Sequence, residues 1–238
     1  LIAPYQSNAG SPLDKARRLY TTDGLGGVAR AVLSKVSGLN ARPQAGEEQF
    51  WRQRAVAAGI PVIDVASFND EAGVAQIAAQ DADLGIIAGT YILKEPAFTA
   101  PRLGSINIHS GKAPEYRGSA PAFWEMYNGE TEVGVTIHWA VSRLDAGNIL
   151  RQRMFRLDPA PPGDPARYIE VYRRAVLRPN GIQLVLEAVQ DIRAGRGAGT
   201  AQRVSHIKPY RLPTYEQKCE LLRRVAERRR AIPNSGAA

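Results

Sequence analysis

The apolar run at residues 84–89 limits the fold of this chain more than any other feature of its sequence. Leu84, Ile86, Ile87 and Ala88 follow one another with one small residue between them. This composition is typical of a strand in a parallel sheet that helices cover on both faces. Because segments with helical spacing lie on both sides of the run, the sequence predicts an α/β domain with a mostly parallel sheet and flanking helices.

The rest of the chain supplies further elements of both kinds. Apolar residues at helical spacing predict helices at residues 28–36, 47–58, 69–80, 121–129 and 168–194. Short or alternating apolar runs predict strands at residues 61–65, 84–89, 105–109 and 133–140. Pro179 predicts an interruption of the longest helix. The chain after residue 145 is predicted to be mostly helical and to end in a basic helix.

The composition excludes several classes of protein. The single cysteine, Cys219, cannot form an internal disulfide framework or a cysteine-based zinc cluster. No run of about 18 apolar residues occurs, so no membrane-spanning helix is predicted, and the start at Leu1 does not resemble a signal peptide. The 31 Lys and Arg outnumber the 23 Asp and Glu, and this net charge of +8 favours anionic partners. We therefore expect a cytoplasmic protein without a bound metal.

Asn107 and His109 are the first candidates for catalysis. They stand two residues apart on the predicted strand at residues 105–109, so both side chains point to the same face. The strand ends in a loop rich in Gly and Pro, where such a sheet places its ligand site. An amide can donate a hydrogen bond to a developing oxyanion, and an imidazole can accept and release a proton. The pair therefore suits the transfer of an acyl-type group.

Asp145 is the third candidate. It follows the predicted strand at residues 133–140, and the small residues Ala146 and Gly147 after it allow a close approach. A carboxylate beside His109 raises the basicity of the imidazole and fixes its tautomer. Because a histidine on a strand is more often a structural group than a catalyst, the residue types alone leave both interpretations open.

Five sequence blocks in a fixed order resemble the formyltransferase family that uses 10-formyltetrahydrofolate. The blocks are Asn107-Ile108-His109, Pro114 with Tyr116-Arg117-Gly118, Gly129-Glu130, Gly134-Val135-Thr136-Ile137 and Leu144-Asp145-Ala146-Gly147. The resemblance runs without gaps from about residue 84 to residue 150 and continues weakly to about residue 194. This family includes glycinamide ribonucleotide, methionyl-tRNA and sugar N-formyltransferases.

The resemblance implies a role for each candidate. Asn107 would polarise the formyl carbonyl and stabilise the tetrahedral oxyanion. His109 would take a proton from the acceptor amine or pass it to the departing folate nitrogen. Asp145 would orient His109 and hold a water that relays protons. The co-substrate would be 10-formyltetrahydrofolate, and no metal would be needed.

The same resemblance implies where the substrates bind. Two loops would hold the pterin through backbone groups, the first formed by Ala88, Gly89, Thr90, Tyr91, Ile92 and Leu93 and the second including Val141 and Ser142. Tyr116 and Arg117 are expected to close over the acceptor, with Arg117 as an anion contact. Lys112 replaces an apolar loop residue of the family, so it would either contact a phosphate of the acceptor or remain a solvated loop lysine.

The resemblance also implies the architecture. Residues 1–195 would form a Rossmann-like catalytic domain that is incomplete at its N-terminus, because nothing before Pro4 supplies the full first strand. Residues 196–238 would form a short, basic, helical extension. Its arginines are expected to face solvent, with an RNA-binding patch as the alternative, and they are Arg223, Arg224, Arg228, Arg229 and Arg230.

The expected function is the transfer of a formyl group from 10-formyltetrahydrofolate to the primary amine of a nucleotide-linked amino sugar. Methionyl-tRNA is the alternative acceptor. The sequence is also compatible with hydrolysis of the folate and with folate binding without turnover. The expected partners are the folate and a small-molecule amine rather than nucleic acid or a membrane, and a homodimer is compatible with the sequence.

Overall fold

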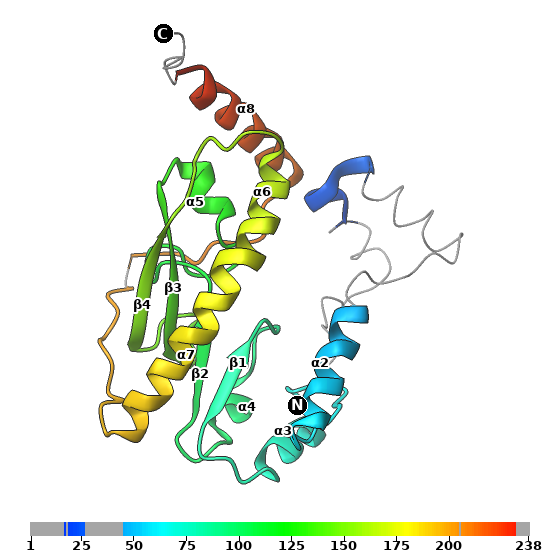
Figure 1. The fold of residues 1–238 in the computed structure, drawn as a ribbon, viewed down its shortest axis with the longest axis vertical. Coiled ribbons are helices and arrows are strands. Elements are labelled where there is room, and N and C mark those ends of the chain that lie inside the picture. Colours follow the sequence, from blue (N-terminus) through cyan, green and yellow to red (C-terminus); the bar gives the residue numbers. More distant parts are fainter. Residues whose placement is uncertain (1–16, 18, 27–44, 205, 232–238) are drawn as a thin grey trace. The chain divides into compact units, whose positions relative to one another are not determined.

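The structure of the chain is a computed structural model, which describes residues 17, 19–26, 45–204 and 206–231 (Figure 1). The chain divides into two compact units, residues 1–81 and residues 82–238. The predicted helix at residues 28–36 and the incomplete strand expected before Pro4 lie outside the described residues. Within the described part of the chain, no helix is long and apolar enough to cross a membrane.

The first unit contains helices α2 (Ala45–Ala57) and α3 (Glu71–Ala78), as the apolar spacing predicts. Asp70 begins α3, because its carboxylate accepts a hydrogen bond of 2.7 Å from the Gly73 N–H. That N–H belongs to the first turn and has no carbonyl partner inside the helix. The strand predicted between the two helices is reduced to a single bridging residue, Asp64.

The second unit is built on one mixed sheet. Its strands are β1 (Gly85–Ala88), β2 (Ser105–His109), β3 (Glu132–Trp139) and β4 (Ile149–Arg156), side by side in this order. β1 is parallel to β2, whereas the pairs β2–β3 and β3–β4 are antiparallel. The α/β class is confirmed, but the described sheet is mixed where a mostly parallel one was expected. The named helices of this unit are α4 (Glu95–Thr99), α5 (Phe123–Asn128), α6 (Pro165–Tyr172), α7 (Arg178–Arg193) and α8 (Tyr215–Ala231).

β4 was not predicted, because its charged composition lacks the apolar pattern that indicates a strand. Three arginines occur among its eight residues. In the structure, Arg151 pairs with Asp191 of α7 and Arg153 pairs with Glu187 of α7. An arginine side chain can lie along a protein surface while its charged group stays in water, so a strand at the edge of the described sheet tolerates it beside α7.

The long helix predicted before residue 194 is interrupted, as expected, although earlier than the proline itself. α6 passes into a π-helical segment, Arg173–Leu177, and then into α7. Pro179 has no N–H, and its ring would meet the carbonyl four residues earlier, so the turn before it widens. α7 crosses one face of the sheet over β2, β3 and β4 (Figure 1). Gly181 allows this packing, because a Cβ there would lie 2.9 Å from Cγ2 of Ile108.

The hydrophobic core of the second unit joins the α7 face of the sheet to the helices. Its fully buried members include Ile106, Val133, Val135 and Ile137 from the strands and Leu177, Leu184 and Ala188 from the helices. Burying a side chain of this kind contributes about 1.5–3 kcal/mol to folding. Because side chains alternate along a strand, Asn107 and His109 point away from this core to the opposite face of the sheet.

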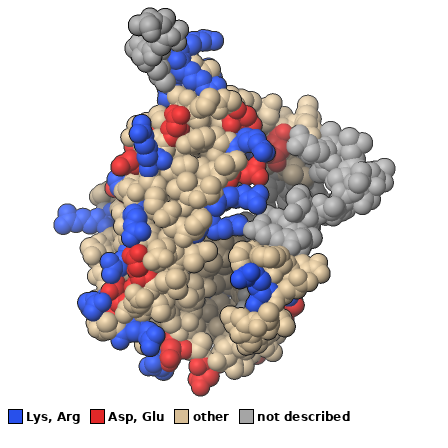
Figure 2. Space-filling view, viewed as in Figure 1, with Lys and Arg blue, Asp and Glu red and all other residues tan. Residues whose placement is uncertain are grey.

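α8 packs on α5 through arginine side chains. Arg228 donates hydrogen bonds to the carbonyls of Met126 and Tyr127, at 2.7 and 3.0 Å. The guanidinium of Arg224 lies 4.0 Å from the centre of the Tyr127 ring. These two arginines, which were expected to face solvent, are therefore part of the packing. Figure 2 shows the remaining Lys and Arg of this face dispersed among Asp and Glu rather than gathered in one patch.

Candidate active site

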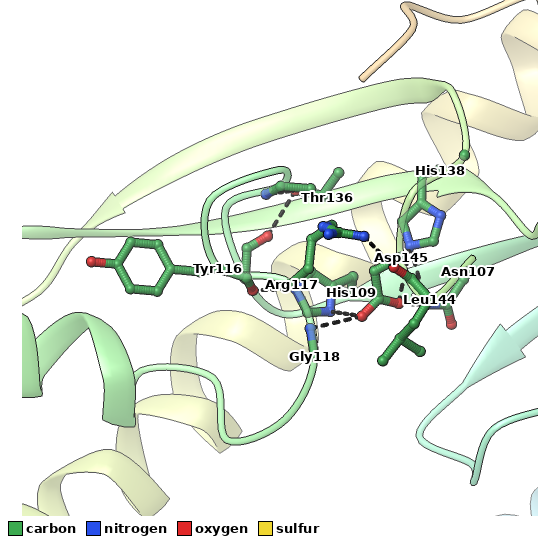
Figure 3. Close-up of polar contacts among 12 residues, drawn as sticks. Asn107, His109, Tyr116, Arg117, Gly118, Thr136, His138, Leu144 and Asp145 are labelled. Atoms are coloured by element: carbon green, nitrogen blue, oxygen red, sulfur yellow. Dashed lines mark hydrogen bonds and ion pairs between the residues drawn. The ribbon is translucent and has the colours of Figure 1, made fainter. Parts of the chain in front are cut away.

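The face of the sheet opposite α7 carries a group of polar side chains. β2 and β3 pair so that Asn107 lies opposite His138 and His109 lies opposite Thr136. Residues directly opposite each other in an antiparallel pair share one face of the sheet. The four side chains therefore gather on this face, as Figure 3 shows.

The loop after β3 brings Asp145 into this group (Figure 3). Asp145 has a φ of +48°, and Gly147 lets the loop fold back, because a Cβ there would collide with the carbonyl oxygen of Trp139. The Gly118 N–H donates to Oδ2 of Asp145 at 2.9 Å, and Gln202 Nε2 donates to the Asp145 carbonyl at 3.1 Å. Both the carboxylate and the backbone of Asp145 are thus held in place.

Asn107, His109, His138 and Asp145 form what we call the polar cluster. Asn107 Nδ2 donates to Oδ1 of Asp145 at 3.2 Å, and His138 Nε2 lies 3.5 Å from the same oxygen. His109 Nδ1 lies 3.5 Å from Oδ2 of Asp145. The two histidines and Asp145 are all less than one tenth exposed. The structure thus brings the three predicted catalytic residues together, while their catalytic roles stay a prediction.

The loop after β2 fixes the tautomer of His109. His109 Nε2 lies 2.7 Å from the carbonyl oxygen of Tyr116, and a carbonyl only accepts, so Nε2 carries the proton. Gly111 allows this approach, because a Cβ there would collide with Nε2. Thr136 secures the loop by donating to the Gly111 carbonyl at 2.7 Å. In the neutral ring the lone pair on Nδ1 therefore faces Asp145.

Burial and charge set the protonation of this pair. Burial lowers the pKa of His109, and the nearby carboxylate of Asp145 offsets only part of this effect. Burial alone would raise the pKa of Asp145, but the contact with His138 and the charges of both histidines outweigh it and lower that pKa. Near neutral pH, Asp145 is therefore ionised and His109 is neutral and ready to accept a proton at Nδ1.

The Arg117 side chain is buried and binds backbone carbonyl groups. It is 1% exposed, and its guanidinium donates to the Leu144 carbonyl at 2.7 Å and to the Ile207 carbonyl at 2.5 Å. These contacts tie the residue before Asp145 to a segment that we call the strap, residues 202–204 and 206–210. The guanidinium thus holds the loop of Asp145, in place of the anion contact that was expected.

The side chains of Tyr116 and Lys112 also lie apart from the polar cluster. The Tyr116 ring points away from it (Figure 3) and stacks on Tyr210 of the strap, with ring centres 5.4 Å apart. Lys112 Nζ lies 3.8 Å from Glu115. These side chains border a cavity of about 190 Å³, whose lining residues are Lys112, Glu115, Tyr116, Glu130, Glu132, Met154 and Tyr210. The structure therefore does not place the Tyr116 ring or the Lys112 side chain beside the three predicted catalytic residues.

The two predicted folate loops lie close to the cluster and to each other. Ala88, which ends β1, is opposite Ile108 in the parallel register, so the loop at residues 88–93 begins beside β2. Ser142 of the second loop donates to Glu95 Oε2 at 2.7 Å, at the start of α4. This hydrogen bond links the second loop to α4, the helix that follows the first loop. Folate binding by these loops stays a prediction.

The candidate site residues expected from the sequence did not include His138, Gly118 or Gln202. Only the register of β2 and β3 shows that His138 faces Asn107, and a single sequence does not contain that register. The contacts of Gly118 and Gln202 join segments that are 27 and 57 residues from Asp145. Within the described residues, no group of His, Cys, Asp and Glu is arranged to hold a metal ion.

Comparison with known sequences supplies a separate finding. The family model described as formyl transferase matches residues 9–164. A methionyl-tRNA formyltransferase from Parabacteroides distasonis is 41% identical over 102 residues, which cover 43% of this chain and 32% of that protein. One from Bacteroides fragilis is 30% identical over 145 residues, which cover 61% of this chain and 43% of that protein. The chain thus spans less than half the length of these relatives.

Solved structures share the fold. The formyltransferase PseJ from Anoxybacillus kamchatkensis, in complex with UDP-4,6-dideoxy-4-formamido-L-AltNAc and tetrahydrofolate, aligns with a TM-score of 0.51 at 22% identity, over 79% of this chain and 88% of that one. Glycinamide ribonucleotide transformylase 1 from Symbiobacterium toebii aligns with a TM-score of 0.51 at 21% identity, over 63% and 73% of the two chains. At these identities the likeness shows the Rossmann-like fold alone.

Proposed function

Because the chain belongs to the formyl transferase family, we propose that it transfers a formyl group from 10-formyltetrahydrofolate to a primary amine. The observation that carries the proposal is the polar cluster, in which the Asp145 carboxylate lies 3.2 Å from the Asn107 amide and 3.5 Å from the His109 imidazole. An amide donor for the oxyanion, a base for the amine proton and a carboxylate that stabilises the protonated base suit this reaction.

Asn107 stabilises the charge that develops on the formyl oxygen. When the amine nitrogen attacks the formyl carbon, the carbonyl oxygen becomes negatively charged. A side-chain N–H of Asn107 then donates a hydrogen bond to that oxygen. Removing one such donor typically lowers the rate by about 10²–10³-fold.

His109 carries the proton between the two nitrogens. The attacking amine becomes positively charged and loses a proton to Nδ1 of His109, where Asp145, 3.5 Å away, stabilises the imidazolium. The same proton then passes to the departing folate nitrogen as its bond to the formyl carbon breaks. One C–N bond forms, one C–N bond breaks, and one proton moves from the acceptor to the donor, so the reaction balances.

The folate would bind along the loops at residues 88–93 and 140–145. Ile92 and Val141 of these loops expose apolar side chains, at 70% and 43%, next to the linked loop ends. Exposed apolar groups with backbone N–H and C=O groups between them suit an aromatic ring with polar edges. The tetrahydrofolate bound to PseJ, which shares this fold, supports a folate as the formyl donor.

The acceptor amine has two candidates. The sequence relatives at 30–41% identity are methionyl-tRNA formyltransferases, so methionyl-tRNA is the first acceptor to test. The amino sugar expected from the sequence is the second, supported by the sugar nucleotide bound to PseJ. Two alternative functions need no acceptor amine: hydrolysis of the folate, and folate binding without turnover.

The experiment is an acceptor screen with the full chain and 10-formyltetrahydrofolate. Release of tetrahydrofolate is followed by absorbance with methionyl-tRNA, with nucleotide-linked amino sugars and without any amine. We expect release only when an amine is present, together with a formylated product. Release without an amine would indicate a hydrolase, and folate binding without release in any mixture would contradict the transferase proposal.

A further inference from the structure

His138 is the member of the polar cluster that the proposed reaction leaves without a role. It lies on β3, is 2% exposed, and its Nε2 lies 3.3 Å from Nδ2 of Asn107 and 3.5 Å from Oδ1 of Asp145. Its ring centre lies 6.4 Å from that of His109. A buried histidine between an amide and a carboxylate can exist in two protonation states, and each state directs the neighbouring hydrogen bonds differently.

The other ring nitrogen of His138 limits these states to two. Nδ1 lies 2.8 Å from the carbonyl oxygen of Trp139, and a carbonyl only accepts, so Nδ1 carries a proton. A neutral His138 therefore has a bare Nε2. A cationic His138 has an N–H at Nε2, which points toward the Asn107 amide and the Asp145 carboxylate.

The hydrogen bonds of Asn107 follow from the state of His138. The Asn107 amide has two N–H groups, and Nδ2 already donates one of them to Asp145. When His138 is neutral, its bare Nε2 accepts the second N–H at 3.3 Å, and the amide has no donor left for a substrate. When His138 is cationic, Nε2 donates to Asp145 instead, and the second N–H of Asn107 is released.

We propose that His138 is a positioning residue that controls whether Asn107 has a free N–H for the formyl oxygen. This inference rests on the proposed function, because the formyl oxygen is the group that the free N–H would bind. His138 acts only through Asn107 and Asp145 and touches no reacting atom. The charged and titratable side chains that face it are Asp145 and His109.

Two substitutions separate the hydrogen-bonding role of His138 from its titration. In His138→Gln the side-chain amide reaches the position of Nε2 and cannot titrate. In His138→Asn the amide reaches only the position of Nδ1, so the contacts with Asn107 and Asp145 are lost. His206→Gln is the matched control, because His206 is exposed and lies outside the polar cluster.

The first measurement is kcat/KM for formyl transfer from pH 5 to pH 9. We expect kcat/KM of His138→Asn to fall by about 10-fold, which is less than the typical loss of about 10²–10³-fold when an oxyanion donor is removed outright. The ratio of wild type to His138→Gln should fall as pH rises, because only wild type ties up Asn107 when His138 becomes neutral. Ionisation of the acceptor amine and of His109 largely cancels in this ratio. A ratio that is flat over the whole pH range would overturn the proposal.

The second measurement needs no turnover. In ¹⁵N-labelled protein, the side-chain amide signals of Asn107, assigned by their loss in Asn107→Asp, should shift with the midpoint at which the His138 ring titrates. The same signals should not shift in this way in His138→Gln, and His206→Gln should behave as wild type. If the chemical shifts of the Asn107 amide do not change as the His138 ring titrates, the proposal is overturned even if formyl transfer is observed. Coupled signals in a protein that transfers no formyl group would contradict the proposed function instead.

Discussion

The polar cluster and helix α5 both bury ionisable groups in the second unit, but they hold them differently. Asp145 accepts the Gly118 N–H at 2.9 Å and the Asn107 amide at 3.2 Å, and its pKa is lowered. Glu125 of α5 is 1% exposed, and neither of its carboxyl oxygens has a hydrogen-bond partner among the described residues. Burial raises the pKa of Glu125 to about 7.

The difference shows what a buried carboxyl group needs to keep its charge. A carboxylate that gains N–H donors and nearby cations stays ionised, whereas one without partners becomes neutral instead. The polar cluster is built so that Asp145 stays charged beside His109. In α5, burial outweighs the effect of the nearby backbone N–H groups of Glu125 and Ala122, so Glu125 takes up a proton as pH falls through about 7.

The largest expected effect comes from removing the charge of Asp145. Asp145→Asn should lower kcat by about 100-fold or more, because a neutral amide no longer stabilises the imidazolium of His109. The measurement is tetrahydrofolate release at saturating amine. Asp83→Asn is the control, since Asp83 forms an exposed pair with Arg102. Equal rates in the two variants would show that the cluster does not depend on this charge.

The next effect concerns the backbone that supports Asp145. Gly118 has a φ of +103°, and a Cβ there would collide with the backbone of Tyr210 in the strap. Gly118→Ala should lower the free energy of unfolding by more than about 3 kcal/mol, from backbone strain and overpacking together. Gly163→Ala, at a φ of +76° with nothing within 4 Å, should lower it by only about 1–2 kcal/mol. Urea unfolding measures both, and similar losses would mean that the strap does not constrain Gly118.

Glu125→Gln tests the other side of the comparison. The pKa of Glu125 in the folded protein, about 7, lies above its usual value of 4.5. The contribution of Glu125 to the free energy of unfolding is therefore fully present below pH 4.5 and is lost as pH rises through 7. At pH 8 the variant should therefore be more stable than wild type by up to about 3 kcal/mol, and at pH 4.5 the two should be equal. Urea unfolding at both pH values checks this. A variant that is less stable at pH 8 would show that the carboxylate has a partner.

The smallest effect is expected for an arginine that only forms exposed ion pairs. Arg223 of α8 pairs with Glu220 and Glu227 at the surface, so Arg223→Ala should leave the unfolding midpoint within error. Arg228 donates hydrogen bonds to carbonyl groups of α5, so Arg228→Ala should lower the free energy of unfolding by about 2 kcal/mol. If the two losses are the same, the arginines of α8 do not hold α5.

Local sequence patterns were sufficient for much of the fold and for three residues of the candidate site. The two-residue spacing of Asn107 and His109 on a strand places both on one face, whatever the rest of the chain does. Asp145 was a candidate because it follows a predicted strand and small residues come after it, and the family resemblance pointed to the same residue. The α/β class followed from runs such as residues 84–89. The expected burial of this run on both faces is wrong, because β1 lies at the edge of the described sheet and Ile86 is 51% exposed.

The remaining features depend on contacts between distant segments, and local pattern does not contain these. β4 was missed because its arginines reach α7, and His138 was not among the expected site residues because strand register decides what it faces. Arg117 has the composition of an anion contact, but its burial under the strap turns it toward carbonyl groups. A sequence shows which groups are available, whereas packing decides which partners they meet.

The account depends most on His109 as the group that moves the proton. The direct test is the single-turnover rate of tetrahydrofolate release by His109→Ala with the amine that the acceptor screen identifies. We expect a loss of about 10²–10⁴-fold, as for removal of a general acid–base group, with unchanged binding of 10-formyltetrahydrofolate. A rate equal to that of wild type would contradict the assignment of His109 and with it the proposed use of the polar cluster.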